Sequence, residues 1–157
     1  MEQIFYRAYM LNGGILAPFD AWLLLRGLRT LPVRMQQHEA DALRVAEYLR
    51  IRPEVGSVHH PAFGENCASL TGHSGVFSFD LASGGFEEVR TFIDGLKRFR
   101  IGVSWGGVES LVISPNRGNN LSYLDWQRMP HSLIRLSIGL EGADVLIADI
   151  GQSLDKL

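Results

Sequence analysis

The chain has 157 residues, 46% of them hydrophobic, and its formal net charge at pH 7 is −2. This length fits one domain that can bury its own core without a disulfide or a metal. The basic residues are scattered rather than clustered, which argues against nucleic acid and acidic membrane surfaces as partners.

Cysteine content and the lack of a long apolar run indicate the cellular setting. The single cysteine, Cys67, cannot form an internal disulfide, and we interpret it as an incidental thiol. No charged segment leading into an apolar run opens the chain, and no apolar stretch approaches the ~20 residues that cross a bilayer. We therefore expect a soluble protein in the reducing cytoplasm.

Residues 18–52 predict two helices. Pro18 suits a first helical turn, and residues 19–28 are apolar on nearly all sides, which is typical of a helix buried between layers or against a partner. Thr30 is the predicted N-cap of the second helix, which Pro53 ends. One apolar stripe at helical spacing marks this second helix: Ala42, Val45, Ala46 and Leu49.

The rest of the chain predicts short strands and two further helices. Alternating residues predict strands at 55–60, 76–81, 101–104 and 133–139. A helix follows the Gly84-Gly85 turn and ends near Lys97, and another covers 143–154. Residues 61–74 and 114–129 lack a clear period and predict loops.

This order of elements predicts an α+β fold, with a small sheet covered on one face by helices. We expect one domain over residues 1–157. The helix at 19–28 is apolar on nearly all sides, and in so small a domain no other predicted element is available to bury its second face. It therefore indicates a further domain or subunit as partner, and we expect a homo-oligomer formed through this helix.

Arg135 is a candidate binding residue because of its place in a strand. The period of two places Ile134 and Leu136 in the core and Arg135 on the opposite face. There its guanidinium could hold a carboxylate through two parallel hydrogen bonds. From the residues alone, an arginine that is exposed at the surface or ion-paired is more common than one that binds a ligand.

The run Ser104-Trp105-Gly106-Gly107 ends a predicted strand and carries a second candidate. Its glycines allow a sharp turn or a close approach of backbone to ligand, and the indole supplies an apolar wall with one N–H donor. The alternative to a binding site is an ordinary strand end and tight turn, with Trp105 packed in the core.

Two segments together resemble the C-terminal domain of the Cys/Met metabolism enzymes. This pyridoxal-phosphate-dependent family includes cystathionine β- and γ-lyases and methionine γ-lyase. The segments are 104–111 (SWGGVESL) and 134–141 (IRLSIGLE). Residues 19–22 and 26–31 are similar to the family's interdomain helix. Residues 75–81 resemble a family strand, with Ser74 and Asp80 replacing a glycine and a glutamate. In the loop after Ile113 the resemblance thins, because residues 114–117 (SPNR) replace the Thr-His that is usual in the family.

The resemblance implies both a fold and a site. The fold is the mainly antiparallel C-terminal domain of fold-type I pyridoxal-phosphate enzymes (32–157), preceded by an interdomain helix region (1–31). In the site, Arg135 binds the α-carboxylate of a sulfur-containing amino acid, and Ser104 and Trp105 line its wall. Val103 stands where γ-cleaving enzymes often carry glutamate, which favours a β-lyase or a methionine-type lyase.

The lysine that binds the cofactor covalently in this family has no counterpart in the sequence. We expect neither of its two lysines, Lys97 and Lys156, to take that role, although Ser153 and Lys156 stand at Ser-x-x-Lys spacing. The resemblance therefore implies that the pyridoxal-phosphate domain is absent, that no catalytic residue lies in this chain and that the chain alone is inactive. Two hypotheses remain: the C-terminal domain of such a lyase, or a stand-alone binding or oligomerisation module that keeps the fold.

Metal binding is a weaker hypothesis. His38 and the pair His59-His60 are possible ligands, but no cysteine or carboxylate partners recur at zinc-like spacing. We interpret these histidines as solvated or locally hydrogen-bonded, and we predict no metal site.

Overall fold

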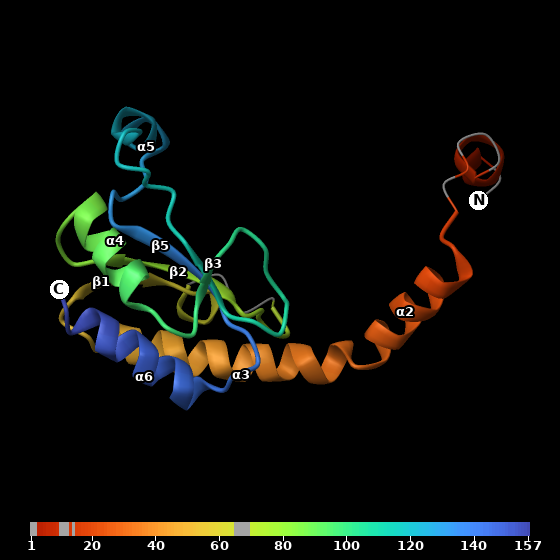
Figure 1. Cartoon of the computed structure of the whole chain (residues 1–157), viewed down its shortest axis with the longest axis horizontal. Coiled ribbons are helices and arrows are strands. Elements are labelled where there is room, and N and C mark those ends of the chain that lie inside the picture. The colour runs from red at the N-terminus through yellow and green to blue at the C-terminus, as the bar shows by residue number, and fades with distance from the viewer. Residues whose placement is uncertain (1–2, 10–12, 14, 65–69) are drawn as a thin grey trace. The chain divides into compact units, whose positions relative to one another are not determined.

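The computed structural model describes residues 3–9, 13, 15–64 and 70–157. It contains two compact units, Met1–Arg34 and Met35–Leu157, and the boundary falls inside helix α3 (Leu31–Arg50) (Figure 1). The boundary is close to residue 31, where the sequence predicts that the interdomain region ends. The functional assignment of these regions stays a prediction.

The described residues of the first unit form a short π-helix, η1 (Ile4–Tyr9), helix α2 (Pro18–Arg29) and the first turn of α3. In η1, Phe5 stacks on Tyr9 with ring centroids 5.2 Å apart. Helix α2 begins at Pro18, as the sequence predicts. Across Pro18–Arg29 every side chain is exposed or half-buried, and Leu25 is 60% exposed. The helix therefore forms although its apolar residues remain uncovered.

Thr30 does not have the capping role that the sequence predicts. Its backbone carbonyl accepts the first helical hydrogen bond of α3, from the Arg34 amide at 3.0 Å. Its hydroxyl instead donates to the carbonyl of Gly27 in α2 and accepts from the Arg34 guanidinium. The reason is the helical backbone of Thr30 (φ −103°, ψ 0°), because an N-cap hydroxyl needs extended geometry to reach the following amides.

The second unit is built on a five-stranded sheet in the order β1-β2-β5-β4-β3. Neighbouring strands are antiparallel except for β3 and β4, which are parallel. The strands are β1 (Val55–His59), β2 (Val76–Leu81), β3 (Arg100–Ile101), β4 (Leu111–Ile113) and β5 (Leu133–Ser137). The predicted α+β class and mainly antiparallel sheet are confirmed.

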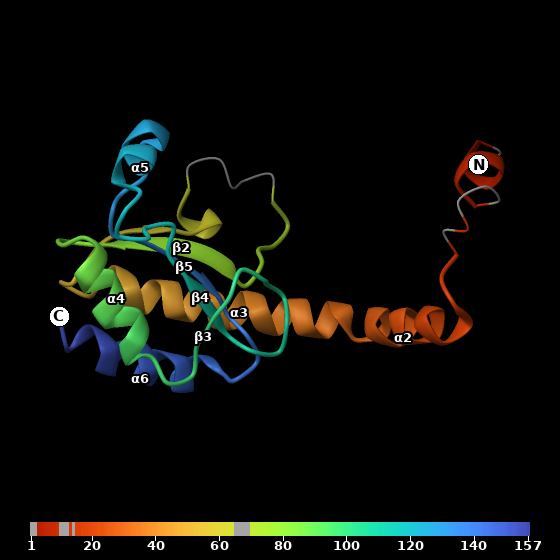
Figure 2. The same cartoon turned by 45° about the horizontal axis from the view of Figure 1, so that its top comes forward.

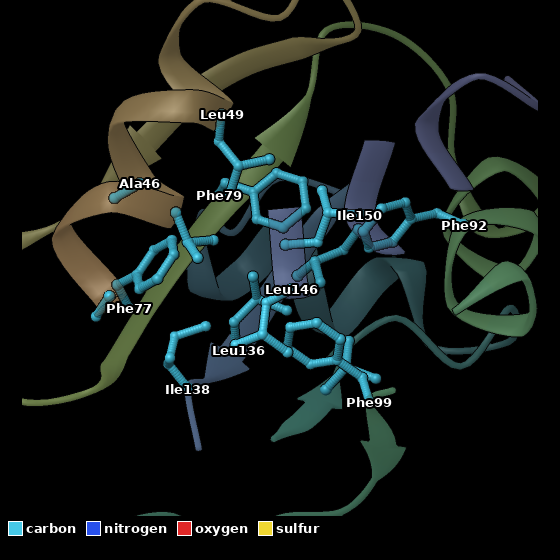
Figure 3. Close-up of a cluster of buried hydrophobic side chains, with 14 of the residues drawn as sticks. Ala46, Leu49, Phe77, Phe79, Phe92, Phe99, Leu136, Ile138, Leu146 and Ile150 are labelled. Carbon is cyan, nitrogen blue, oxygen red and sulfur yellow. The ribbon is translucent and has the colours of Figure 1, made fainter. Parts of the chain in front are cut away.

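Helices α3, α4 (Phe86–Gly95) and α6 (Ala143–Leu154) cover one face of this sheet (Figures 1 and 2). Strand alternation supplies the other half of the core, since Phe77 and Phe79 of β2 and Leu136 of β5 point toward the helices. Figure 3 shows these rings and branched chains meeting between the layers. The predicted stripes are buried, at Ala42, Val45, Ala46 and Leu49 in α3 and at Leu146, Ile150 and Leu154 in α6.

The predictions for residues 101–129 are partly wrong. The strand expected at 101–104 is only Arg100–Ile101, because the carbonyls of Val103 and Ser104 bond to a side chain instead of a neighbouring strand. Strand β4 was not predicted, since three residues are too few for an alternation. The loop expected at 114–129 contains helix α5 (Leu121–Gln127), in which Leu124 is the one buried residue and no apolar stripe exists.

No helix within the described part of the chain is long and apolar enough to span a membrane.

Candidate functional site

Arg135 lies on the sheet face opposite the helices. Its neighbours Ile134 and Leu136 are fully buried in the core, whereas Arg135 itself is half-buried. Across the same face it pairs with Ser78 of β2 and Ile113 of β4. The structure therefore places Arg135 as the alternation predicts, at the centre of the face that the helices leave open.

The guanidinium of Arg135 reaches the segment that follows β3. Its Nη2 donates to the carbonyl oxygens of Val103 and Ser104, both at 2.9 Å. Its Nε is buried and has no hydrogen-bond partner among the described residues. A buried donor without a partner is costly. The side chain is thus held in place by backbone and keeps unused hydrogen-bonding capacity.

Ser104 and Trp105 lie in an exposed turn beside this arginine. Gly106 has φ +74°, a conformation that favours glycine, so the chain can reverse there. Trp105 is 66% exposed and Val103 is 73% exposed. The structure therefore brings Val103, Ser104 and Arg135 together, and Trp105 is a surface residue rather than part of the core.

A second polar cluster, which the sequence did not predict, lies at the far end of the same turn. The carboxylate of Glu141 accepts from the amide of Ser110 at 2.7 Å and from its hydroxyl at 2.8 Å. The Ser110 hydroxyl in turn accepts from the Gly139 amide at 2.8 Å. Both contributing segments, 104–111 and 134–141, are recognisable in the sequence, but only the fold shows that these residues meet.

The histidines have local structural partners, in agreement with their interpretation as hydrogen-bonded residues. His38 Nδ1 lies 2.8 Å from the carbonyl oxygen of Ile138, and His59 Nε2 lies 2.8 Å from Asp80 Oδ1. The Nδ1 of His60 accepts from the Ala62 amide at 3.1 Å. Among the described residues no group of three or more potential ligands could hold a metal ion. Cys67 lies outside the described residues.

His60 should make stability dependent on pH. Burial, together with the nearby His73, lowers the pKa of His60 below its usual 6.5, although Glu39 opposes this shift. The unfolded chain therefore takes up a proton at a higher pH than the folded chain does. Stability should fall as pH decreases from about 7 to about 5.5.

Urea unfolding at several pH values would test this expectation. His60→Asn should reduce the loss of stability on acidification, because the amide oxygen can still accept from the backbone without binding a proton. His131→Gln, at a half-buried position, serves as the matched control. An unchanged pH dependence in His60→Asn would count against the assignment.

Sequence comparison identifies the family. Residues 2–155 match the model of the Cys/Met metabolism PLP-dependent enzymes, where PLP is pyridoxal phosphate. The chain belongs to this family. Cystathionine beta-lyase of Bordetella avium is 43% identical over 143 residues, which cover 87% of this chain and 36% of that protein. Cystathionine gamma-lyase of Bacillus subtilis is 38% identical over 156 residues, covering 93% and 41% respectively.

A solved structure from the family confirms the fold. The putative O-acetylhomoserine (thiol)-lyase of Campylobacter jejuni superposes with a TM-score of 0.83 at 32% identity, covering 98% of this chain and 37% of that one. That structure contains N'-pyridoxyl-lysine-5'-monophosphate. The family is thus PLP-dependent, and this chain spans well under half the length of these relatives.

The two lysines of this family member lie on the other side of the sheet from Arg135. Its two lysines both lie beside the helical layer: the Lys97 amide donates to Asp149 of α6, and Lys156 Nζ approaches Gly95 of α4. Arg135 projects from the opposite face of the sheet.

Proposed function

We propose that this chain forms the substrate-carboxylate-binding part of a PLP-dependent carbon–sulfur lyase of sulfur amino-acid metabolism, similar to cystathionine β-lyase. The position of Arg135 is the main support. Its guanidinium lies on the open face of the sheet, against the turn that carries Ser104 and Trp105. A cationic planar donor beside an exposed indole suits a small zwitterion with an apolar side chain.

In this proposal Arg135 binds the α-carboxylate. Its Nη1 donates to no described residue and is free for the ligand, while Nη2 is held by two backbone carbonyls. The ligand carboxylate is therefore held through Nη1, while the two carbonyls of the turn fix the orientation of the guanidinium. Ser104 and Trp105 form the wall of the site, and Val103 contributes to specificity. Val103 favours a β-lyase or a methionine-type lyase, and the run Ser104-Trp105-Gly106-Gly107 is especially similar to that of cystathionine β-lyase.

The remaining parts of the site would come from outside this chain. A PLP domain would supply the lysine and the cofactor, which stabilises negative charge at the substrate's α-carbon. The chain alone is therefore inactive in this proposal, and it acts in the cytoplasm. The uncovered apolar face of α2 over residues 19–28 supports association with that domain or with a second copy of the chain.

A binding experiment tests the carboxylate site. Titration of the ¹⁵N-labelled chain with L-methionine should shift the Arg135 Nε–H and Trp105 indole signals, whereas L-methioninamide, which lacks the carboxylate, should not. Arg135→Ala should abolish the response. Arg90→Ala, which removes an exposed arginine from α4, should retain it. An equal response to methioninamide, or retained binding in Arg135→Ala, would contradict the proposal.

A second experiment tests whether the chain can hold the cofactor alone. After incubation with PLP and borohydride, intact mass and peptide mapping should show no site-specific pyridoxyl adduct. A stoichiometric adduct on Lys97 or Lys156 would refute the proposed division of the site.

The alternative is a stand-alone oligomerisation module that retains the fold. The exposure of α2, whose Phe19 and Trp22 rings stack at the surface, favours it. Light scattering that shows a dimer, together with no response to methionine, would support this alternative. A monomer would count against both association through α2 and the module.

A further inference from the structure

We propose that Glu141 and Ser110 are positioning residues that hold the turn 102–110 against Arg135 and so maintain the carboxylate site. The inference rests on the proposed function for its ligand, but its structural part stands on three hydrogen bonds. Neither residue touches the proposed ligand; both act through the turn.

The three bonds form a closed arrangement. The two oxygens of Glu141 accept from the amide and the hydroxyl of Ser110, and that hydroxyl accepts from the amide of Gly139. Ser110 is fully buried. Hydrogen bonds to an ionised carboxylate are about twice as strong as neutral ones, and burial shields them from competing water. The end of the turn is therefore tied firmly to the chain that leaves β5.

The same stretch of backbone carries Arg135. The backbone runs from Arg135 in β5 through Gly139 and Glu141 toward α6. A turn that is attached to Gly139 and Glu141 is therefore also fixed in position relative to Arg135. The Leu140 amide adds a bond to the carbonyl of Val108 at 2.9 Å. At the other end, the Gly102 amide donates to the carbonyl of Val112 at 3.2 Å. Both ends of the turn are thus fastened by polar contacts.

Side-chain packing contributes little to holding the middle of the turn. Val103, Trp105 and Val108 are 73%, 66% and 63% exposed, respectively. A segment with few buried apolar contacts depends on its hydrogen bonds for order. Loss of the Glu141 or Ser110 contacts should therefore loosen the turn locally, while the core beneath the sheet stays folded.

The chain offers matched controls for both residues. Glu109 is an exposed glutamate next to Ser110, so Glu109→Gln removes the same charge from the turn without removing the three bonds. Ser153 is a fully buried serine whose hydroxyl donates to the Phe92 carbonyl in the helical layer. Ser153→Ala therefore reproduces the loss of a buried hydroxyl away from the turn.

The test combines binding and hydrogen exchange. In Glu141→Gln and Ser110→Ala, the affinity for L-methionine should fall about fivefold, the effect expected for loss of one net hydrogen bond. The amides of Gly102 and Leu140, which donate to the carbonyls of Val112 and Val108 and so fasten the turn, should exchange about fivefold faster, with amides of β2 and α6 unchanged. Glu109→Gln and Ser153→Ala should change neither the affinity nor the exchange in the turn.

The possible results separate the two proposals. Unchanged exchange in the turn of Glu141→Gln and Ser110→Ala overturns the positioning role, and so does an exchange increase spread evenly over the core. If the wild-type chain does not bind methionine, the proposed function fails, while faster exchange confined to the amides of Gly102 and Leu140 still supports the positioning role. If the wild-type chain binds methionine and both variants bind it with the same affinity, the positioning role is refuted, whereas the proposed carboxylate site is not.

Discussion

Replacing Phe79 by alanine is expected to lower the free energy of unfolding by about 3–5 kcal/mol. Phe79 is fully buried in β2 and meets Phe92 of α4 edge-to-face, with ring centroids 5.6 Å apart and an interplanar angle of 83°. The substitution removes apolar contacts to the helical layer and leaves a cavity that neighbouring residues cannot fill completely. Figure 3 shows Phe79 between Leu49 and Ile150. Urea denaturation gives the free energy directly.

Two further variants sharpen this measurement. Tyr123→Ala removes an aromatic ring that is 54% exposed and should change stability by about 0.5 kcal/mol or less. The double variant Phe79→Ala/Phe92→Ala should lose less than the sum of the two single changes, because the rings share one contact. A loss below about 1 kcal/mol for Phe79→Ala would contradict the core described above.

Gly139→Ala is expected to cost about 1–3 kcal/mol and to disturb the turn that carries Ser104. A Cβ at this position would lie 2.5 Å from the Val108 carbonyl oxygen and 2.6 Å from the Glu109 carbonyl carbon. It would also meet the Glu141 carboxylate. Because two of these obstacles are backbone atoms, the turn itself must shift. Thermal unfolding and the amide spectrum of residues 103–110 would show both effects.

Gly27→Ala is the matched control for this substitution. Gly27 lies inside α2, and a Cβ there would meet no atom within 4 Å. Alanine favours the helix by about 1 kcal/mol, so helicity should be retained or increase. A wild-type amide spectrum for Gly139→Ala would show that the turn is looser than the structure indicates.

Much of the fold can be predicted from the sequence, because a strong periodicity of apolar residues indicates which side chains are buried. The alternation in β5 correctly predicts that Ile134 and Leu136 are buried and that Arg135 faces away. The stripe in α6 predicts the bounds of that helix, Ala143–Leu154. By contrast, β4 and α5 are short, and α5 buries only Leu124, so neither leaves a periodic signal.

For the site, the sequence by itself identifies the family and the two segments, and it places Arg135 on the open face. The tertiary structure alone decides that the Arg135 guanidinium holds the carbonyls of Val103 and Ser104, and that Glu141 binds Ser110. These contacts join residues about thirty positions apart in the chain. Local periodicity specifies which face a side chain takes, whereas its partners depend on how the strands pair.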